Sequence, residues 1–138
     1  MSEAAKPSAD ALSRVPLFSG LERGELEQIA GQTSLLEFEP GSVVVREGER
    51  GPRVVAFFVV AEGRAGVSVG GEDRGTLEPG DYFGEIGLLR DAARTATVTA
   101  ETELRCYGLS AWDFRSCLRD RPDISLKLLE ELARRLEQ

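Results

Sequence analysis

The sequence predicts a mainly β fold with flanking α-helices, in which an antiparallel sandwich or roll lies between an N-terminal helical segment and C-terminal helices. Three observations lead to this prediction. Short runs of apolar and β-branched residues, separated by glycines, fill residues 35–109. The tripeptide Glu-Pro-Gly occurs twice there, at 39–41 and 78–80, and suits a type II turn. Apolar residues at helical spacing precede and follow this region.

The chain has 138 residues, a length that suits one domain with its own core. We predict a disordered tail over residues 1–12, which are rich in Ser, Ala, Lys and Pro, and a single domain over residues 13–138. No apolar run approaches the roughly 18 residues needed to span a bilayer, and no signal peptide precedes the fold. A cytoplasmic protein is therefore expected.

The charge and the missing residue types exclude several functions. A net charge of −7 disfavours nucleic-acid binding, which relies on a broad basic surface. The absence of histidine excludes a Ser-His-Asp triad and a histidine metal site. Since no other catalytic cluster stands out, we expect neither an enzyme nor a bound metal or cofactor. Cys106 and Cys117 are expected to be small hydrophobes in a reducing compartment.

The elements follow from the local patterns. Leu26, Ile29 and Ala30 fit a helical period, and Gly31 is near the end of that helix. After Leu35 the period becomes that of strands. Strands are expected at residues 42–46, 54–61, 64–69, 74–77 and 104–109, with a hairpin tip at Gly70-Gly71.

Two helices are expected at the C-terminal end. Ser110 with Asp113 has the form of a helix cap, and Phe114 begins the apolar face of that helix. The last helix begins at Pro122. Its apolar stripe consists of Ile124, Leu128, Leu132 and Leu136, widened by Leu129 and Ala133. So wide a stripe needs cover from the barrel, from a ligand or from the same helix of a second copy.

Residues 82–89 and Arg94 form a candidate ligand site. Gly84 and Gly87 lack a Cβ, so a phosphate can approach the main-chain N–H groups of a helix start. Arg94 adds a planar cation that can grip two phosphate oxygens. Glu85 would repel a phosphate, and its oxygens suit a ribose hydroxyl instead. These features point to a mononucleotide, although a common turn and a solvated arginine explain each piece taken singly.

The combination resembles a known family. The run Gly84-Glu85-Ile86-Gly87-Leu88-Leu89, then four residues, then Arg94-Thr95-Ala96-Thr97, is similar to the phosphate-binding cassette of cyclic nucleotide-binding domains. The resemblance covers roughly residues 14–138. It implies a β-roll of jelly-roll type and cAMP or cGMP as the ligand. Ala93 departs from the proline that the family often has there, which loosens the turn without removing a ligand contact.

Three further residues belong to the candidate site: the resemblance implies Val67 and Arg135, and the chemistry of its hydroxyl adds Thr95. Val67 falls where the catabolite activator branch places a wall of the nucleotide pocket, although an ordinary core valine is the alternative. Arg135 would point toward Glu85 and bring the last helix over the site, unless it is a solvated arginine. The Thr95 hydroxyl can serve a phosphate oxygen or the extra amino group of guanine. We favour cAMP, since the resemblance and the Ala/Arg/Gly/Leu-rich composition look bacterial, but cGMP stays open.

The expected function is a regulatory sensor domain that binds cAMP and couples binding to movement of the C-terminal helix. It would control an unknown effector domain or protein. Because no helix-turn-helix follows, direct DNA binding by this chain is not expected, and a homodimer through the C-terminal helix stays open. The rival hypothesis is a structural or interaction domain on the same roll with no ligand.

Overall fold

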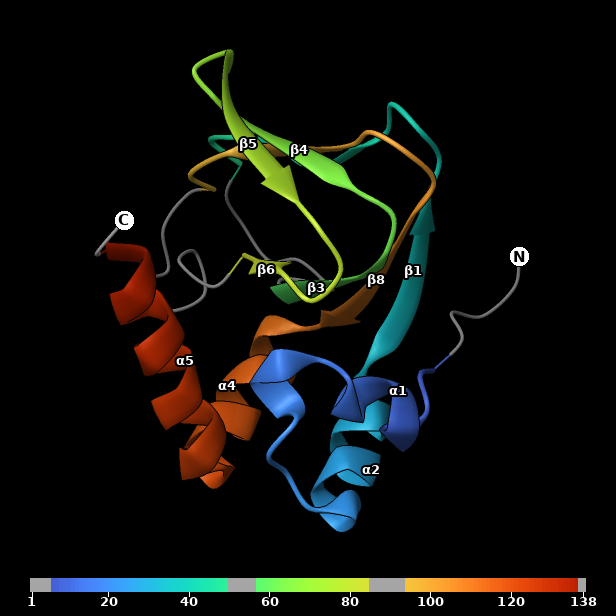
Figure 1. Ribbon diagram of the computed structural model, residues 1–138, viewed down its shortest axis with the longest axis vertical. Coiled ribbons are helices and arrows are strands. Elements are labelled where there is room, and N and C mark those ends of the chain that lie inside the picture. The colour runs from blue at the N-terminus through green and yellow to red at the C-terminus, as the bar shows by residue number, and fades with distance from the viewer. Residues whose placement is uncertain (1–5, 50–56, 85–93, 137–138) are drawn as a thin grey trace.

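The structure is a computed structural model that describes residues 6–49, 57–84 and 94–136 (Figure 1). Its elements, in chain order, are α1 (Ala9–Ser13), the 3-10 helix η1 (Pro16–Phe18), α2 (Arg23–Gln32), β1 (Ser34–Phe38), β2 (Val43–Val45), β3 (Phe57–Glu62), β4 (Ala65–Val69), β5 (Glu72–Leu77), β6 (Tyr82–Phe83), β7 (Thr97–Ala100), β8 (Leu104–Leu109), α4 (Ala111–Asp120) and α5 (Pro122–Leu136).

The strands form two four-stranded antiparallel sheets, with the orders β1-β8-β3-β6 and β2-β7-β4-β5. Figure 1 shows three layers, with the helices on one side of the first sheet and β4 and β5 on the other. The predicted mainly β fold, with helices at both ends of an antiparallel roll, is confirmed.

Strand β3 is covered on both faces. Its residues 57–60 are all buried, and successive side chains of a strand point to opposite faces. Phe57 and Val59 join the helix-side core, whose other members include Leu12, Phe18, Ile29, Tyr82, Leu109, Phe114, Cys117, Ile124 and Leu128. Phe58 and Val60 join the inter-sheet core, with Val45, Ala65, Phe83, Val98, Ala100, Leu104 and Cys106. The first sheet therefore separates two apolar cores.

Both Glu-Pro-Gly turns are confirmed as type II turns. Gly41 has a φ of 89°, which the third residue of such a turn requires and which glycine adopts without strain. The N–H of Ser42 donates to the carbonyl of Glu39 at 3.0 Å and closes the turn. The second turn, at residues 78–81, repeats this geometry with a φ of 96° at its glycine and a closing bond of 2.9 Å.

The predicted disordered tail over residues 1–12 is wrong for its last part. Residues 9–12 lie in α1, where the Ser8 hydroxyl caps the helix by accepting from the N–H of Ala11 at 3.1 Å. Ala9 and Leu12 lie three positions apart on one helix face and pack into the helix-side core. The prediction rested on the overall composition of residues 1–12 and missed this short apolar face. The folded part therefore begins earlier than predicted.

The C-terminal helices begin where the sequence predicts. The Ser110 hydroxyl accepts from the N–H of Asp113 at 3.1 Å, and α5 starts at Pro122. Of the predicted stripe, Ile124 and Leu128 are buried, whereas Leu129 is 62% exposed in the single chain. Across the described residues, none of the helices combines the length and the apolarity that a membrane span needs.

Both cysteines are free and buried, as predicted. Burial alone raises the pKa of the Cys106 thiol to about 12. For Cys117, burial is the main cause of a pKa of about 11. Both thiols are therefore neutral at physiological pH and behave as small apolar groups.

Candidate functional site

Strand β6 ends directly before Gly84, the first glycine of the candidate site. Phe83 pairs with Phe58 of β3, and their rings stack in the inter-sheet core with centroids 4.7 Å apart. Gly84 follows at once with a φ of 97°, a conformation in which a Cβ would be strained. The position of this glycine is therefore set by a buried aromatic pair immediately before it.

The main chain of Arg94 is held from the opposite side. Its N–H donates to the carbonyl of Glu49 at 3.0 Å, and its carbonyl accepts from the N–H of Gly48 at 2.8 Å. Strand β7 begins three residues later, at Thr97. The turn after β2 thus fixes the backbone from which the arginine side chain extends. This role of Gly48 and Glu49 cannot be recognised in the sequence, since no local pattern shows which strand they face.

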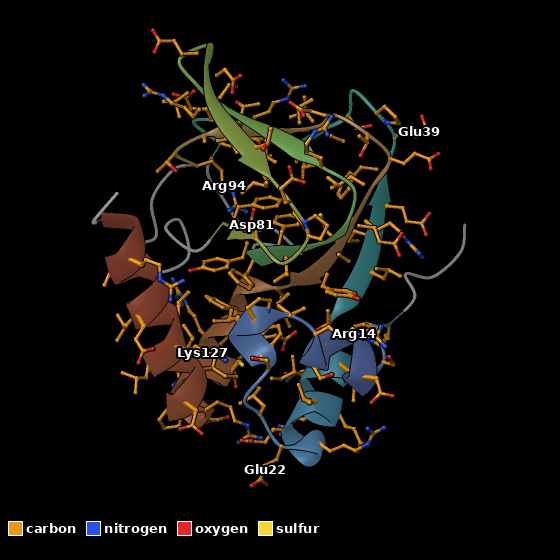
Figure 2. All side chains as sticks on the ribbon, in the orientation of Figure 1. Arg14, Glu22, Glu39, Asp81, Arg94 and Lys127 are labelled. Carbon is orange, nitrogen blue, oxygen red and sulfur yellow. The ribbon has the colours of Figure 1, made fainter. Side chains whose placement is uncertain are left out.

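The Arg94 side chain turns toward the glycine that follows β6. Its Nη1 donates to the carbonyl oxygen of Gly84 at 3.5 Å, and the contact is partly buried. At this length the hydrogen bond is weak, and it mainly shows the direction in which the Arg94 side chain points. Figure 2 labels Arg94 close to the end of β6, in agreement with this contact. A strand start from the second sheet and a strand end from the first sheet therefore bring a glycine and a guanidinium together.

The structure places the other predicted site residues as follows. Val67 lies on β4 opposite Val98 of β7 and is partly buried against the inter-sheet core. Thr95 is exposed beside Arg94. Glu85, Ile86 and Gly87 lie outside the described residues, and for Arg135, whose backbone is part of α5, the side chain does too. The described residues thus bring Gly84 and Arg94 into contact, and the ligand-binding roles of all the predicted site residues stay predictions.

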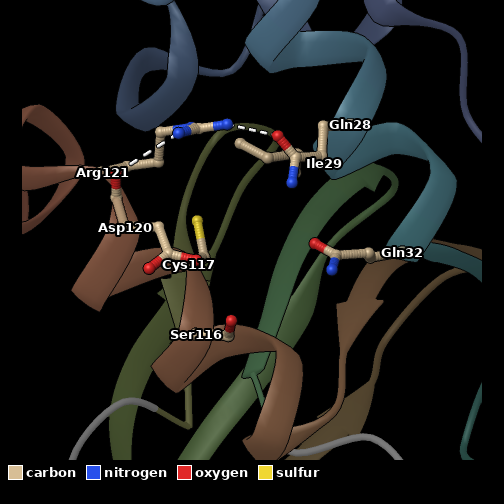
Figure 3. A pocket seen from close by; sticks show the side chains of 7 residues that line it. All are labelled: Gln28, Ile29, Gln32, Ser116, Cys117, Asp120 and Arg121. Atoms are coloured by element: carbon tan, nitrogen blue, oxygen red, sulfur yellow. Dashed lines mark hydrogen bonds between the residues drawn. The ribbon is translucent and has the colours of Figure 1, made fainter.

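A small cavity of about 20 Å³ lies in the helical layer (Figure 3). It is lined by Gln28, Ile29 and Gln32 of α2, by Ser116, Cys117 and Asp120 of α4, and by Arg121. Arg121 contacts Glu25 with its Nε at 3.2 Å and donates to Gln28, so it ties the α4–α5 junction to α2. This volume holds about one water molecule, far below the roughly 300 Å³ of a small-ligand pocket. A nucleotide does not fit there.

Comparison with known proteins bears on the same region. Residues 35–121 match the family model described as cyclic nucleotide-binding domain. The chain is 41% identical over 109 residues to a cAMP-dependent protein kinase regulatory subunit of Yarrowia lipolytica, which covers 78% of this chain and 28% of that protein. It is 33% identical over 132 residues to a CRP-like cAMP-activated global transcriptional regulator of Mycobacterium tuberculosis, covering 92% of this chain and 58% of that one.

A solved structure adds a second kind of ligand. The regulatory subunit of a cAMP-independent protein kinase A from Trypanosoma cruzi, bound to guanosine, superposes with a TM-score of 0.72 and 29% identity over 86% of this chain and 42% of that one. The chain spans less than two thirds of each of these three relatives. The family model matches more than half of the chain. The chain belongs to the cyclic nucleotide-binding domain family.

Proposed function

We propose that this chain is the sensor domain of a signalling protein, which binds cAMP and passes the binding event on through α5. The observation that carries the proposal is the contact between the Arg94 guanidinium and Gly84. In this position a planar cation faces the positive-φ glycine at which the family-like cassette begins. A cyclic phosphodiester suits this site because it carries a single negative charge and needs both a cation and main-chain donors.

The remaining contacts are assigned by the resemblance. In this proposal the Glu85 carboxylate accepts from a ribose hydroxyl, and Ile86 and Gly87 complete the turn around the phosphate. Val67 forms part of the pocket wall, which its partial burial beside Val98 supports. Thr95 follows Arg94 at the exposed edge of the site, where its hydroxyl can reach a ligand.

The ligand preference rests on the relatives. Two of them carry cAMP in their names, the fungal kinase regulatory subunit and the mycobacterial regulator. The trypanosome relative is described as cAMP-independent and holds guanosine, so similar folds serve a different ligand. We place cAMP first because of these two names. We keep cGMP as the second candidate because the Thr95 hydroxyl can accept from the amino group of guanine.

Coupling to α5 is supported by its attachments to the N-terminal segment. Ile124 and Leu128 pack into the helix-side core, and Lys127 Nζ donates to the Ser19 hydroxyl at 3.0 Å. Ligand binding shifts this helix only by the difference in affinity between its two positions, typically about 1 to 3 kcal/mol. We propose that Arg135 takes part in that shift by pairing with Glu85.

We further propose the extent of the domain and its partners. The domain runs from α1 through α5, acts without catalysis of its own, and controls an effector domain or protein of unknown kind. Leu126 and Leu129 of α5 are 59% and 62% exposed, and a homodimer through this helix would cover them. Sedimentation velocity tests this: the wild-type chain should dimerise at high concentration, and the Leu126→Asp, Leu129→Asp double variant should stay monomeric.

One titration experiment tests the proposed function. Calorimetry of the purified chain with cAMP, cGMP and guanosine in parallel should show the tightest binding for cAMP. Saturating cAMP should also raise the melting temperature, since a ligand stabilises only a protein that binds it. Preference for cGMP would revise the ligand alone. No heat and no thermal shift with any of the three would reject the sensor function in favour of a structural or interaction domain.

A further inference from the structure

Glu47 connects three separate segments of the second sheet. Its N–H donates to the Thr97 hydroxyl, at the start of β7, at 3.0 Å. Its carboxylate Oε1 accepts from the N–H of Gly70 at 2.8 Å. Gly70 and Gly71 form the tip of the β4–β5 hairpin, with φ values of 60° and 82°. One residue after β2 therefore holds both the β7 start and a hairpin tip.

The turn that contains Glu47 is closed on itself. The N–H of Glu49 donates to the carbonyl of Arg46 at 3.2 Å, and the N–H of Arg46 donates back to the Glu49 carboxylate at 2.8 Å. Between them Gly48 has a φ of 85°, which favours glycine. These two hydrogen bonds tie residues 46–49 to one another, so Glu47 is part of a closed turn.

The two residues after Glu47 hold the main chain of Arg94. The Gly48 N–H and the Glu49 carbonyl make the paired hydrogen bonds of 2.8 Å and 3.0 Å described above. The Arg94 side chain then reaches across to Gly84. Glu47 thus lies one peptide away from the anchor of the proposed phosphate-binding cation, and its carboxylate fixes that anchor to the hairpin tip.

We propose that Glu47 is a positioning residue for ligand binding: it sets the direction of the Arg94 side chain by clamping the turn at residues 46–49 between Gly70 and Thr97. This inference rests on the proposed function of Arg94. In this role Glu47 acts through its bonds to Gly70 and Thr97 and needs no contact with the ligand. A carboxylate suits this clamp because it offers only acceptors, and a hairpin tip offers N–H donors.

The test compares Glu47→Ala with two matched variants. Glu47→Gln keeps an acceptor oxygen for the Gly70 N–H and should bind cAMP like the wild type. Glu101→Ala removes a carboxylate that joins two other connections, β7–β8 and β3–β4, through a 2.7 Å bond to Arg64 Nε. Removing one such hydrogen bond should weaken cAMP binding about three- to tenfold in Glu47→Ala, and less than about twofold in Glu101→Ala.

A second measurement needs no ligand. In the unliganded protein, Glu47→Ala should speed amide hydrogen exchange at residues 69–72 and 94–97, and should leave the β1–β8 pair unchanged. Thr97→Val, which keeps the shape and removes the acceptor of the Glu47 N–H, should speed exchange at 94–97 as well. Similar melting temperatures for Glu47→Ala and Glu101→Ala would show that the affinity change does not follow general destabilisation.

The outcomes separate this inference from the proposed function. Unchanged exchange at 94–97 in Glu47→Ala overturns the positioning role, whatever the wild type binds. An equal loss of affinity in Glu47→Ala and Glu101→Ala, or no rescue by Glu47→Gln, overturns it too. If the wild type binds no nucleotide while exchange at 94–97 responds, the sensor function fails and the clamp on Arg94 stands.

Discussion

The guanidinium of Arg94 lies 3.5 Å from the main-chain oxygen of Gly84, ten residues earlier in the chain and at the end of the other sheet. The two residues belong to segments that sheet pairing holds independently, β6 through β3 and the start of β7 through β2 and β4. The contact therefore depends on how the two sheets pack, and any change at their junction alters it.

Replacing Arg94 should abolish measurable cAMP binding. Arg94→Ala leaves a desolvated phosphate without its cation, which should cost about 3 to 5 kcal/mol, more than about a hundredfold in affinity. Arg94→Lys keeps the charge and loses the planar fork, so its affinity for cAMP should lie between those of the wild type and Arg94→Ala. Arg64→Ala, at an exposed arginine in the connection between β3 and β4, is the calorimetric control. Binding by Arg94→Ala within about twofold of wild type would remove this residue from the site.

Two glycines with the same φ should respond differently to alanine. Gly41 and Gly63 both have a φ of 89°, but a Cβ at Gly41 meets nothing within 4 Å, whereas one at Gly63 would lie 2.1 Å from the Glu103 carbonyl oxygen. In urea unfolding, Gly41→Ala should lose about 1 to 2 kcal/mol for the left-handed conformation. Gly63→Ala should lose more, above about 3 kcal/mol. Equal losses would mean that the loop at residue 103 moves aside freely.

Two aromatic residues of α4 should differ in how much their replacement by alanine lowers the free energy of unfolding. Phe114 is 1% exposed and stacks on Phe57 with ring centroids 4.2 Å apart, whereas Trp112, two residues earlier on α4, is 81% exposed. Phe114→Ala should destabilise the fold by about 3 to 5 kcal/mol. Trp112→Ala should change the stability of the monomer by less than about 0.5 kcal/mol. Chemical denaturation measures both, and a large loss at Trp112 would show that this side chain is covered in solution.

The buried thiols should make the fold less stable in alkali. The pKa values of Cys106 and Cys117 rise from 9.0 to about 12 and about 11 because burial disfavours the thiolate. Their stabilising effect is fully present below pH 9 and is lost as the pH rises toward 11 and 12, because only the unfolded thiols release protons there. The free energy of unfolding, measured from pH 8 to 11, should fall less steeply in a Cys106→Ala, Cys117→Ala variant. Parallel curves would contradict the assignment.

Much of the local structure was predictable because its causes are local. The two Glu-Pro-Gly turns, the Ser110 cap and the Pro122 helix start each depend on residues within four positions. Strand β8 covers residues 104–109, the range in which a strand was expected. The proximity of Gly84 and Arg94 was indicated for the same reason, since both belong to one short motif, and their role in ligand binding stays a prediction.

The parts that were not predictable depend on distant partners. The strand order β1-β8-β3-β6 places the last strand between the first and the third, which no local period encodes. Leu12 of α1 is fully buried, and its burial comes from helices and strands that lie far from it in the sequence. The anchoring of Arg94 by Gly48 and Glu49 joins residues more than forty positions apart. The ligand contacts of Gly84, Glu85, Gly87, Arg94 and Arg135 stay predictions.

Within the described residues, the helix-side core and the inter-sheet core have no member in common, because β3, β6 and β8 direct alternate side chains to opposite faces. The helices on one face of the first sheet can therefore be redesigned, or fused to a reporter, while the inter-sheet core on its other face keeps its own packing. The roll is therefore suited to protein engineering in which the helical layer is exchanged and the two sheets are kept.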